Sequence, residues 1–181
     1  MFGLFKKKVE PNLDRSREAI VERILSNNEA FYDIERVEEK MDIPLVARCD
    51  FFQRVEKFLL SKKAELYTTE AEEFLYIFST EHLSKETYEK CKEYALKDSE
   101  PRMHIGPEHM CSYVSYYFIV DSFDEEVAAL IRKCKIYKSF KFSLQGWMSG
   151  RMTLVGLKDK VFIHNSDGKA MTKTLAQILI H

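Results

Sequence analysis

The sequence predicts a single α+β domain with a mainly antiparallel sheet, and three observations lead to that prediction. Phe and Tyr supply nearly all of the 13% aromatic residues, which favours a sheet-rich core because rings pack well on pleated, half-buried surfaces. The segment 137–163 alternates apolar and polar residues between turn-forming residues, as short strands do. Segments with helical spacing of apolar residues flank the strand-like ones. A chain of 181 residues is long enough to bury a sizeable core.

The segment from Tyr137 to Lys169 organises this prediction. Phe140, Phe142 and Leu144 share one parity, so we expect a strand that buries all three on one face. Apolar runs around Met152–Leu154 and Val161–Ile163 predict two more strands. The result is a C-terminal three-stranded antiparallel meander. Trp147 lies at its first corner, and Gly146 and Gly150 bracket a bend there.

The remaining elements follow from caps, spacing and turn residues along the chain. Residues 1–11 are predicted to be a flexible tail, and residues 12–181 the domain. Four helices are expected: from Asn12 or Asp14 to Asn28, from a Ser84 cap to Lys97, behind 122–125, and over 171–180. The helix behind 122–125 joins two strands in a strand–helix–strand unit. Other strands are expected within 31–41, from Pro44 to Phe51, from Lys57 or Lys63 to Tyr67, over 74–78 and over 111–120, with an acidic turn at 69–72.

Charge and cysteine usage limit the classes of partner and compartment. Lys plus Arg is 28 and Asp plus Glu is 29, so no net field attracts nucleic acid, and none is expected as a partner. The cysteines at 49, 91, 111 and 134 are widely spaced and form no CxxC pair, so we expect reduced thiols in a cytoplasmic protein. The start MFGLFKKK does not match a signal peptide, and no apolar run is long enough for a membrane span.

The segment 104–111 offers the strongest candidate for a metal site. His104, Glu108, His109 and Cys111 carry side chains of the kinds that bind zinc or iron. Gly106-Pro107 excludes a regular helix across the segment, so the two histidines cannot share a helix face. The alternative is a surface loop whose histidines hydrogen-bond to the backbone.

Asp50 and Glu65 are a second candidate, on neighbouring predicted strands. Magnesium-dependent cleavage of phosphodiesters requires carboxylates on adjacent strand ends to hold the metal. No lysine stands two residues after Glu65, where Tyr67 lies. The alternative is a solvated, charged face of the sheet.

Two further patterns concern ligand contact. Phe140 and Phe142 in the segment 138–142 have the spacing of base-stacking rings in RNA recognition motifs, but burying them favours folding more. Trp147 and Arg151 are candidate ligand-binding residues, because a guanidinium beside an indole ring can form a cation–π pair or contact an anion.

Several short segments resemble an uncharacterised bacterial domain-of-unknown-function family. They are YDIER (Tyr32–Arg36), FLLSKKAELY (Phe58–Tyr67), EHM (Glu108–Met110), KSFKFSLQGW followed by RMTLVGLK (138–158), and NSDGK (Asn165–Lys169). The resemblance implies single-domain organisation and no activity. We therefore expect a non-catalytic domain without a cofactor that binds a protein partner or small ligand. The alternative is a metal-dependent, nuclease-like hydrolase using the 104–111 loop or Asp50 and Glu65.

Overall fold

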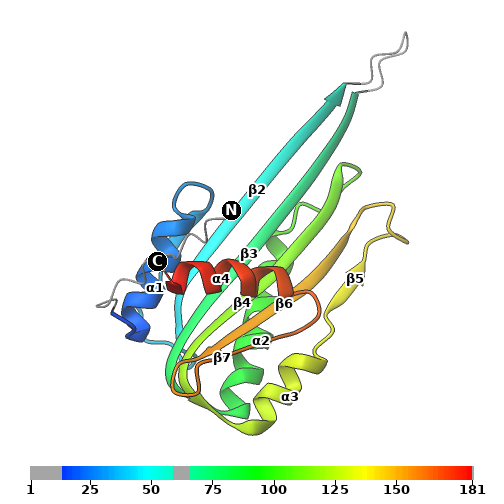
Figure 1. Cartoon of the computed structure of the whole chain (residues 1–181). Coiled ribbons are helices and arrows are strands. Elements are labelled where there is room, and N and C mark those ends of the chain that lie inside the picture. Colours follow the sequence, from blue (N-terminus) through cyan, green and yellow to red (C-terminus); the bar gives the residue numbers. More distant parts are fainter. Residues whose placement is uncertain (1–13, 59–65, 181) are drawn as a thin grey trace, which may run out of the picture.

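A seven-stranded mixed sheet forms the centre of the computed structural model, which describes residues 14–58 and 66–180 (Figure 1). The predicted tail at 1–11 lies outside the described residues, as does Glu65. The strands are β1 (Asp33–Arg36), β2 (Leu45–Phe58), β3 (Leu66–Leu83), β4 (His109–Phe123), β5 (Tyr137–Ser139), β6 (Trp147–Gly156) and β7 (Val161–His164). The helices are α1 (Arg17–Asn28), α2 (Lys85–Ser99), α3 (Glu125–Lys133) and α4 (Lys169–Ile180), with a 3₁₀ turn at Glu100–Arg102.

The strand order is β1-β2-β3-β4-β6-β5, and β7 pairs with the later half of β6. The α+β class is confirmed, but the prediction of a mainly antiparallel sheet is wrong. Strands β3, β4 and β6 run parallel at the centre, and the remaining pairs are antiparallel. The cause is topological: α2 and α3 each return the chain to the end of the sheet where it started, as a crossover helix does.

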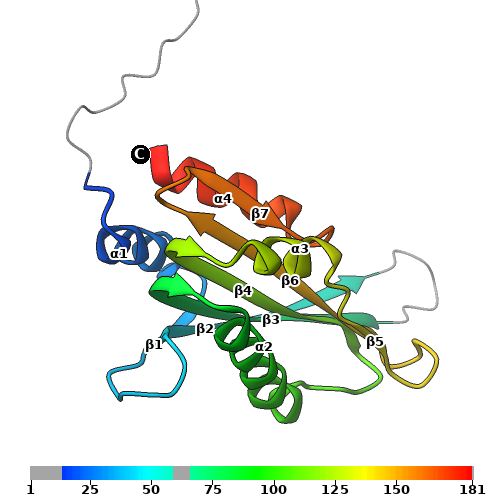
Figure 2. The ribbon, with the colours of Figure 1, turned by 90° about the horizontal axis from the view of Figure 1, so that it is seen from below.

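The helices cover the two faces of the sheet in pairs, as the view in Figure 2 shows. Helices α2 and α3 pack on one face over a core rich in aromatic rings from the central strands, including Tyr76, Phe78 and Phe118. Helices α1 and α4 pack together on the other face, over Leu75, Ile77 and neighbouring side chains. The sheet thus has an apolar core on each side.

Caps explain where the first two helices begin. The Ser84 hydroxyl accepts a hydrogen bond from the backbone N–H of Thr87, so α2 starts where the sequence predicts. Helix α1 starts later than predicted, because Ser16 is the cap and accepts from the N–H of Ala19. Asp14 instead accepts a hydrogen bond from the N–H of Ser16.

The predicted acidic turn at 69–72 is wrong, because these residues continue β3. They pair in register with β2, with Glu72 opposite Phe52 and Thr69 opposite Val55. The buried Glu72 carboxylate is tolerated there because it accepts hydrogen bonds from the Ser112 hydroxyl and the backbone N–H of His104. The link between β2 and β3 falls at residues 59–65, outside the described residues.

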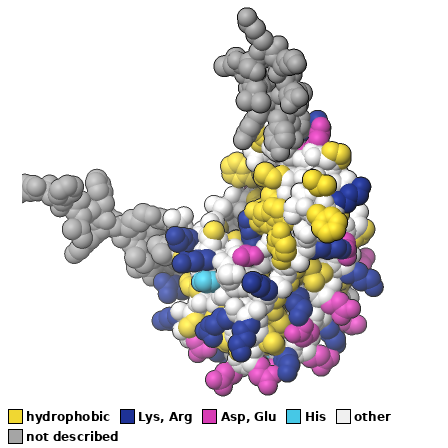
Figure 3. All heavy atoms as spheres, turned by 90° about the vertical axis from the view of Figure 1, so that its right-hand side faces the viewer, with side chains coloured by type: hydrophobic (Ala, Val, Ile, Leu, Met, Phe, Trp, Pro, Cys, Tyr) yellow, Lys and Arg dark blue, Asp and Glu magenta, His cyan; other side chains and the backbone are white. Residues whose placement is uncertain are grey.

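The predicted meander is only partly correct. The segments form antiparallel β5, β6 and β7 in that order, but β5 and β7 share one edge of β6 while β4 occupies the other. Strand β5 ends at Ser139, so only Phe140 is buried, whereas Phe142 and Leu144 are 98% and 79% exposed. Figure 3 faces this edge of the molecule.

The predicted bend between Gly146 and Gly150 is also only partly correct. Gly146 adopts a φ of 75° in the β5–β6 connection, a conformation that favours glycine. Gly150 instead lies inside β6, where a Cβ atom would come within 2.6 Å of Ile136. Close packing, and not a bend, therefore explains the second glycine.

Candidate functional site

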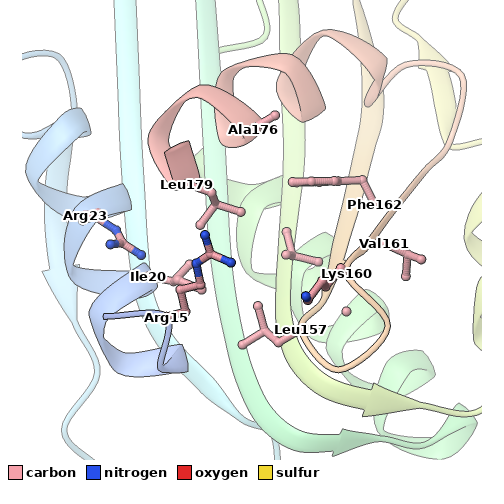
Figure 4. A pocket seen from close by; sticks show the side chains of 11 residues that line it. Arg15, Ile20, Arg23, Leu157, Lys160, Val161, Phe162, Ala176 and Leu179 are labelled. Atoms are coloured by element: carbon pink, nitrogen blue, oxygen red, sulfur yellow. The ribbon is translucent and has the colours of Figure 1, made fainter. Parts of the chain in front are cut away.

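A pocket with mainly apolar walls lies where α1, α4 and the β6–β7 hairpin meet (Figure 4). We call it the apolar pocket. Its volume is about 290 Å³. The walls come from all of these elements, with Ile20 on α1, Val155 on β6, Phe162 on β7, and Ala176 and Leu179 on α4. Ile20 and Val155 belong to the core itself, so the floor of the pocket is rigid, while the Phe162 ring is 37% exposed at the mouth.

Three cationic side chains border the apolar pocket: Arg15, Arg23 and Lys160. Figure 4 shows the two arginines on the α1 side and Lys160 on the hairpin side. The Nε and one terminal nitrogen of Arg23 are buried and have no hydrogen-bond partner within the described residues. Arg23 also acts on Asp14, whose pKa is lowered chiefly by hydrogen bonds from Ser16 and to a smaller extent by the Arg23 charge.

An unpaired, partly buried guanidinium carries a desolvation cost that an anion would offset. The apolar walls and cationic border therefore suit a small molecule with an apolar body and one negative group. Small-molecule sites usually combine such walls with a few polar groups, and this volume lies near the lower end of their range.

A second feature is a polar cluster on the α2 side of the sheet, in which Glu72, His109 and Ser112 are buried and the His104 side chain is 67% exposed. Glu72 Oε1 accepts from the Ser112 hydroxyl at 2.7 Å and from the His104 N–H at 3.1 Å. Its Oε2 lies 2.8 Å from His104 Nδ1. Nε2 of His109 lies 2.7 Å from the Ser112 hydroxyl, and its Nδ1 donates to the Gln145 carbonyl at 2.7 Å. A register shift in β4 makes this possible, because the extra residue Met110 moves His109 to the face of Ser112.

The cluster contains the side-chain types of a serine hydrolase, but not their arrangement. The Glu72 carboxylate contacts the hydroxyl of Ser112, whereas in a catalytic triad it would orient the imidazole. The side chains of Glu72 and His109 are 3% and 0% exposed, so a substrate has no route to the hydroxyl. The cluster therefore acts as a structural link between β3 and β4.

The structure brings together two of the four residues predicted to bind metal. These are His104 and His109, whose Nδ1 and Nε2 atoms lie 2.8 and 3.8 Å from the carboxylate oxygens of Glu72. Glu72 is absent from the predicted set. Glu108 instead pairs with Arg54 at 3.2 Å, and Cys111 is buried. No group of three or more His, Cys, Asp and Glu side chains in residues 14–58 and 66–180 is placed to hold a metal ion. Metal binding at this loop stays a prediction.

Asp50 forms an ion pair with Arg102, whose guanidinium also donates to Asp98 and Tyr76. Burial raises the pKa of Asp50 and Arg102 opposes this shift. One Asp50 oxygen is buried without a hydrogen-bond partner in the described part of the chain. The second predicted carboxylate, Glu65, lies outside the described residues, so a paired metal site there stays a prediction.

Trp147 and Arg151 line a shared cleft of about 410 Å³ with Tyr113, Tyr137 and Asp167. Tyr137 stacks on Trp147, but the Arg151 guanidinium lies over Tyr113 and not over the indole. Arg151 also approaches Glu73 at 3.8 Å. Ligand contact at Trp147 and Arg151 stays a prediction.

The comparison with known families assigns the chain to a family but gives no activity. A family model described as Domain of unknown function (DUF8052) matches residues 16–177. The chain belongs to this family. The match begins just before α1, includes all seven strands of the sheet, and ends within α4. No curated protein and no solved structure matches the chain. None of the described helices is long and apolar enough to cross a membrane.

Sequence reasoning missed the apolar pocket, because three separate segments of the chain, within 15–23, 155–162 and 176–179, form it. A partial signal was present in α1. Its apolar stripe includes Ile20 and Ile24, and Arg23 falls directly beside that stripe. A cation next to the apolar stripe of a helix indicates a partly buried charge. The sequence of α1 does not show, however, which residues of α4 pack beside Arg23.

Proposed function

We propose that this domain binds a small amphipathic carboxylic acid in the apolar pocket. The observation that carries the proposal is the Arg23 guanidinium, two of whose nitrogens are buried beside apolar walls with no hydrogen-bond partner in the described chain. A carboxylate is the natural partner of a guanidinium, because it can accept from two nitrogens at once, and the Arg23 side chain has to turn to bring its buried nitrogens to the pocket. Arg15 and Lys160 add positive charge at the same border.

The walls define the rest of the ligand. They are formed by aliphatic side chains and one ring, so they favour an unbranched or compact hydrocarbon body and provide no hydroxyl or amide contacts from side chains. The pocket volume of about 290 Å³ equals that of about ten water molecules at about 30 Å³ each, so only a short hydrocarbon chain fits. Octanoate is a suitable probe of this chemistry.

Titration calorimetry of the full chain with octanoate tests the proposal, with octan-1-ol as the neutral comparison. Octanoate should bind and octan-1-ol should bind more weakly. Arg23→Gln should weaken octanoate binding by roughly tenfold to a hundredfold, because a charge-assisted hydrogen bond contributes about 1.5–3 kcal/mol. Arg132→Gln, on the exposed surface of α3, is the matched control and should leave binding unchanged.

The melting temperature without ligand separates a binding role of Arg23 from a structural one. Because its buried nitrogens have no partner to lose, Arg23→Gln should melt at the wild-type temperature or above it. If Arg23 stabilised the fold, the variant would melt below wild type. Ala176→Phe should fill the pocket and abolish binding while keeping the charge. If octanoate does not bind, or binds Arg23→Gln as tightly as wild type, the proposal is wrong.

A further inference from the structure

The β5–β6 connection, residues 140–146, is a rigid loop that displays apolar side chains to solvent. The Phe140 ring is buried beneath it, and the loop is closed by hydrogen bonds from the Phe140 N–H to the Gly146 carbonyl and from the Gln145 N–H to the Phe140 carbonyl. Lys141, Phe142 and Ser143 have φ values of 45°, 55° and 67°. Three successive residues with side chains in the left-handed region are unusual, since each is disfavoured.

The consequence of this backbone is the outward direction of Phe142 and Leu144, which are 98% and 79% exposed. Tyr137 and Met110 add exposed apolar surface beside the loop, and the Met110 carbonyl lies against Gly146. Figure 3 shows hydrophobic side chains gathered at the height of this connection, with most acidic side chains lower, towards α3. Single exposed apolar residues are common, but a group on one strained loop indicates a contact surface.

The charged residues of the loop and of the adjoining strand β5 are all lysines. Residues 135–147 contain three lysines and no Asp or Glu, although the whole chain has a net charge of −1. Lys135, Lys138 and Lys141 are exposed close to the loop. The acidic side chains that approach from other elements already have partners: Glu100 with Lys138, Asp167 with the Ser149 hydroxyl, and Glu108 with Arg54.

We propose that this loop attaches the domain to an anionic membrane surface. A protruding pair of apolar side chains can enter the acyl boundary, where a groove-shaped surface could not. The lysines around it would meet anionic headgroups, and the stacked Tyr137 and Trp147 rings at its base have the amphipathic character typical of the headgroup level. This surface shares no residue with the apolar pocket, so the two proposals stand or fall separately.

Vesicle co-sedimentation of the full chain tests this, with phosphatidylcholine vesicles compared to vesicles that also contain phosphatidylglycerol. The protein should partition at least tenfold more strongly onto the anionic vesicles, and 0.5 M salt should reduce that binding. Trp147 is the only tryptophan, so its emission should shift to shorter wavelength on binding. Brominated lipids should quench it.

Matched variants assign the contact to the loop. Phe142→Ala/Leu144→Ala should lower vesicle binding at least tenfold with unchanged circular dichroism and melting temperature, because both side chains are exposed. Lys141→Glu should lower binding to anionic vesicles only. Phe31→Ala, which removes a 71% exposed ring at the end of α1, should bind as wild type does.

Either of two outcomes would overturn the proposal: equal binding by wild type and the double variant, or no binding to anionic vesicles at all. If vesicles do not bind but a single-stranded oligouridine binds tightly, measured by fluorescence anisotropy, and the double variant loses that binding, the same surface would be assigned to nucleic acid, through base stacking.

Discussion

Phe140 and Phe142 differ by two positions in the chain, yet the structure gives them opposite environments. Phe140 is 9% exposed and packs edge-on against His109, with ring centroids 5.7 Å apart, whereas Phe142 is 98% exposed. A buried Phe removes about 150–250 Å² from water, so at about 25 cal/mol per Å² the Phe140 ring contributes about 4–6 kcal/mol. Phe140→Ala should cost a similar amount, since such truncations cost about 3–5 kcal/mol. Phe142→Ala should change stability by less than about 0.5 kcal/mol.

Urea and thermal unfolding followed by circular dichroism measure both variants. For a domain of this length 1 kcal/mol shifts the melting temperature by about 2–4 °C, so Phe140→Ala should melt about 6–20 °C below wild type. Phe142→Ala is its internal control. If the two variants lose similar stability, a regular strand that buries both rings is correct and the left-handed loop is wrong. If neither loses stability, Phe140 does not belong to the core.

Gly146→Val should destabilise by more than about 2 kcal/mol in urea unfolding, because φ is 75° and a Cβ would meet a side-chain nitrogen and two carbonyl oxygens within 2.6 Å. Gly106→Ala, where a Cβ meets nothing within 4 Å, should be nearly neutral, and similar losses in the two variants would contradict the loop geometry. Ser112→Ala should cost about 1–3 kcal/mol because it leaves the buried carboxylate and imidazole without their shared partner, and an unchanged midpoint would show that the link is dispensable. All four cysteines are free thiols, and burial raises the pKa of Cys49 and Cys91 to about 12. Thiols of the unfolded chain lose their protons from about pH 8.5, whereas the two buried thiols stay protonated up to about pH 12. Deprotonation therefore stabilises the unfolded state alone over this interval, and the free energy of unfolding should fall between about pH 8.5 and 12. A variant with both replaced by Ala should lose less stability over that interval than wild type; equal losses would exclude the thiols as the cause.

Local signals predicted the elements whose causes are local. The Ser84 cap fixed the start of α2, and the apolar run 111–120 gave the central strand β4, buried on both faces. The stripe in 171–180 gave most of α4. Each of these depends on residues within a few positions of one another, which is why patterns and caps suffice.

The errors have the opposite origin. Glu72 reads as a turn residue, but its carboxylate is bound by His104 and Ser112, more than thirty positions later. Strict alternation predicts that Phe142 is buried, yet the β5 ladder ends at Ser139 and the chain reverses in a left-handed turn. The parallel pairing of β3 with β4 and of β4 with β6 joins strands that a helix separates in the chain, and the apolar pocket depends on three separate segments. No local pattern contains that information.

The pairing of α1 with α4 has a consequence for synthesis of the protein. Ile20 and Ile24 of α1 share one core with Met171 and Leu175 of α4. At about 5–20 residues per second, the ribosome needs roughly 7–30 s to proceed from the end of α1 to the start of α4. During that interval the α2–α3 side of the sheet can close as soon as β6 emerges. Helix α1 cannot complete its core until α4 has been synthesised. The topology therefore imposes an order on folding, in which the α2–α3 face of the sheet can be covered well before the α1–α4 face.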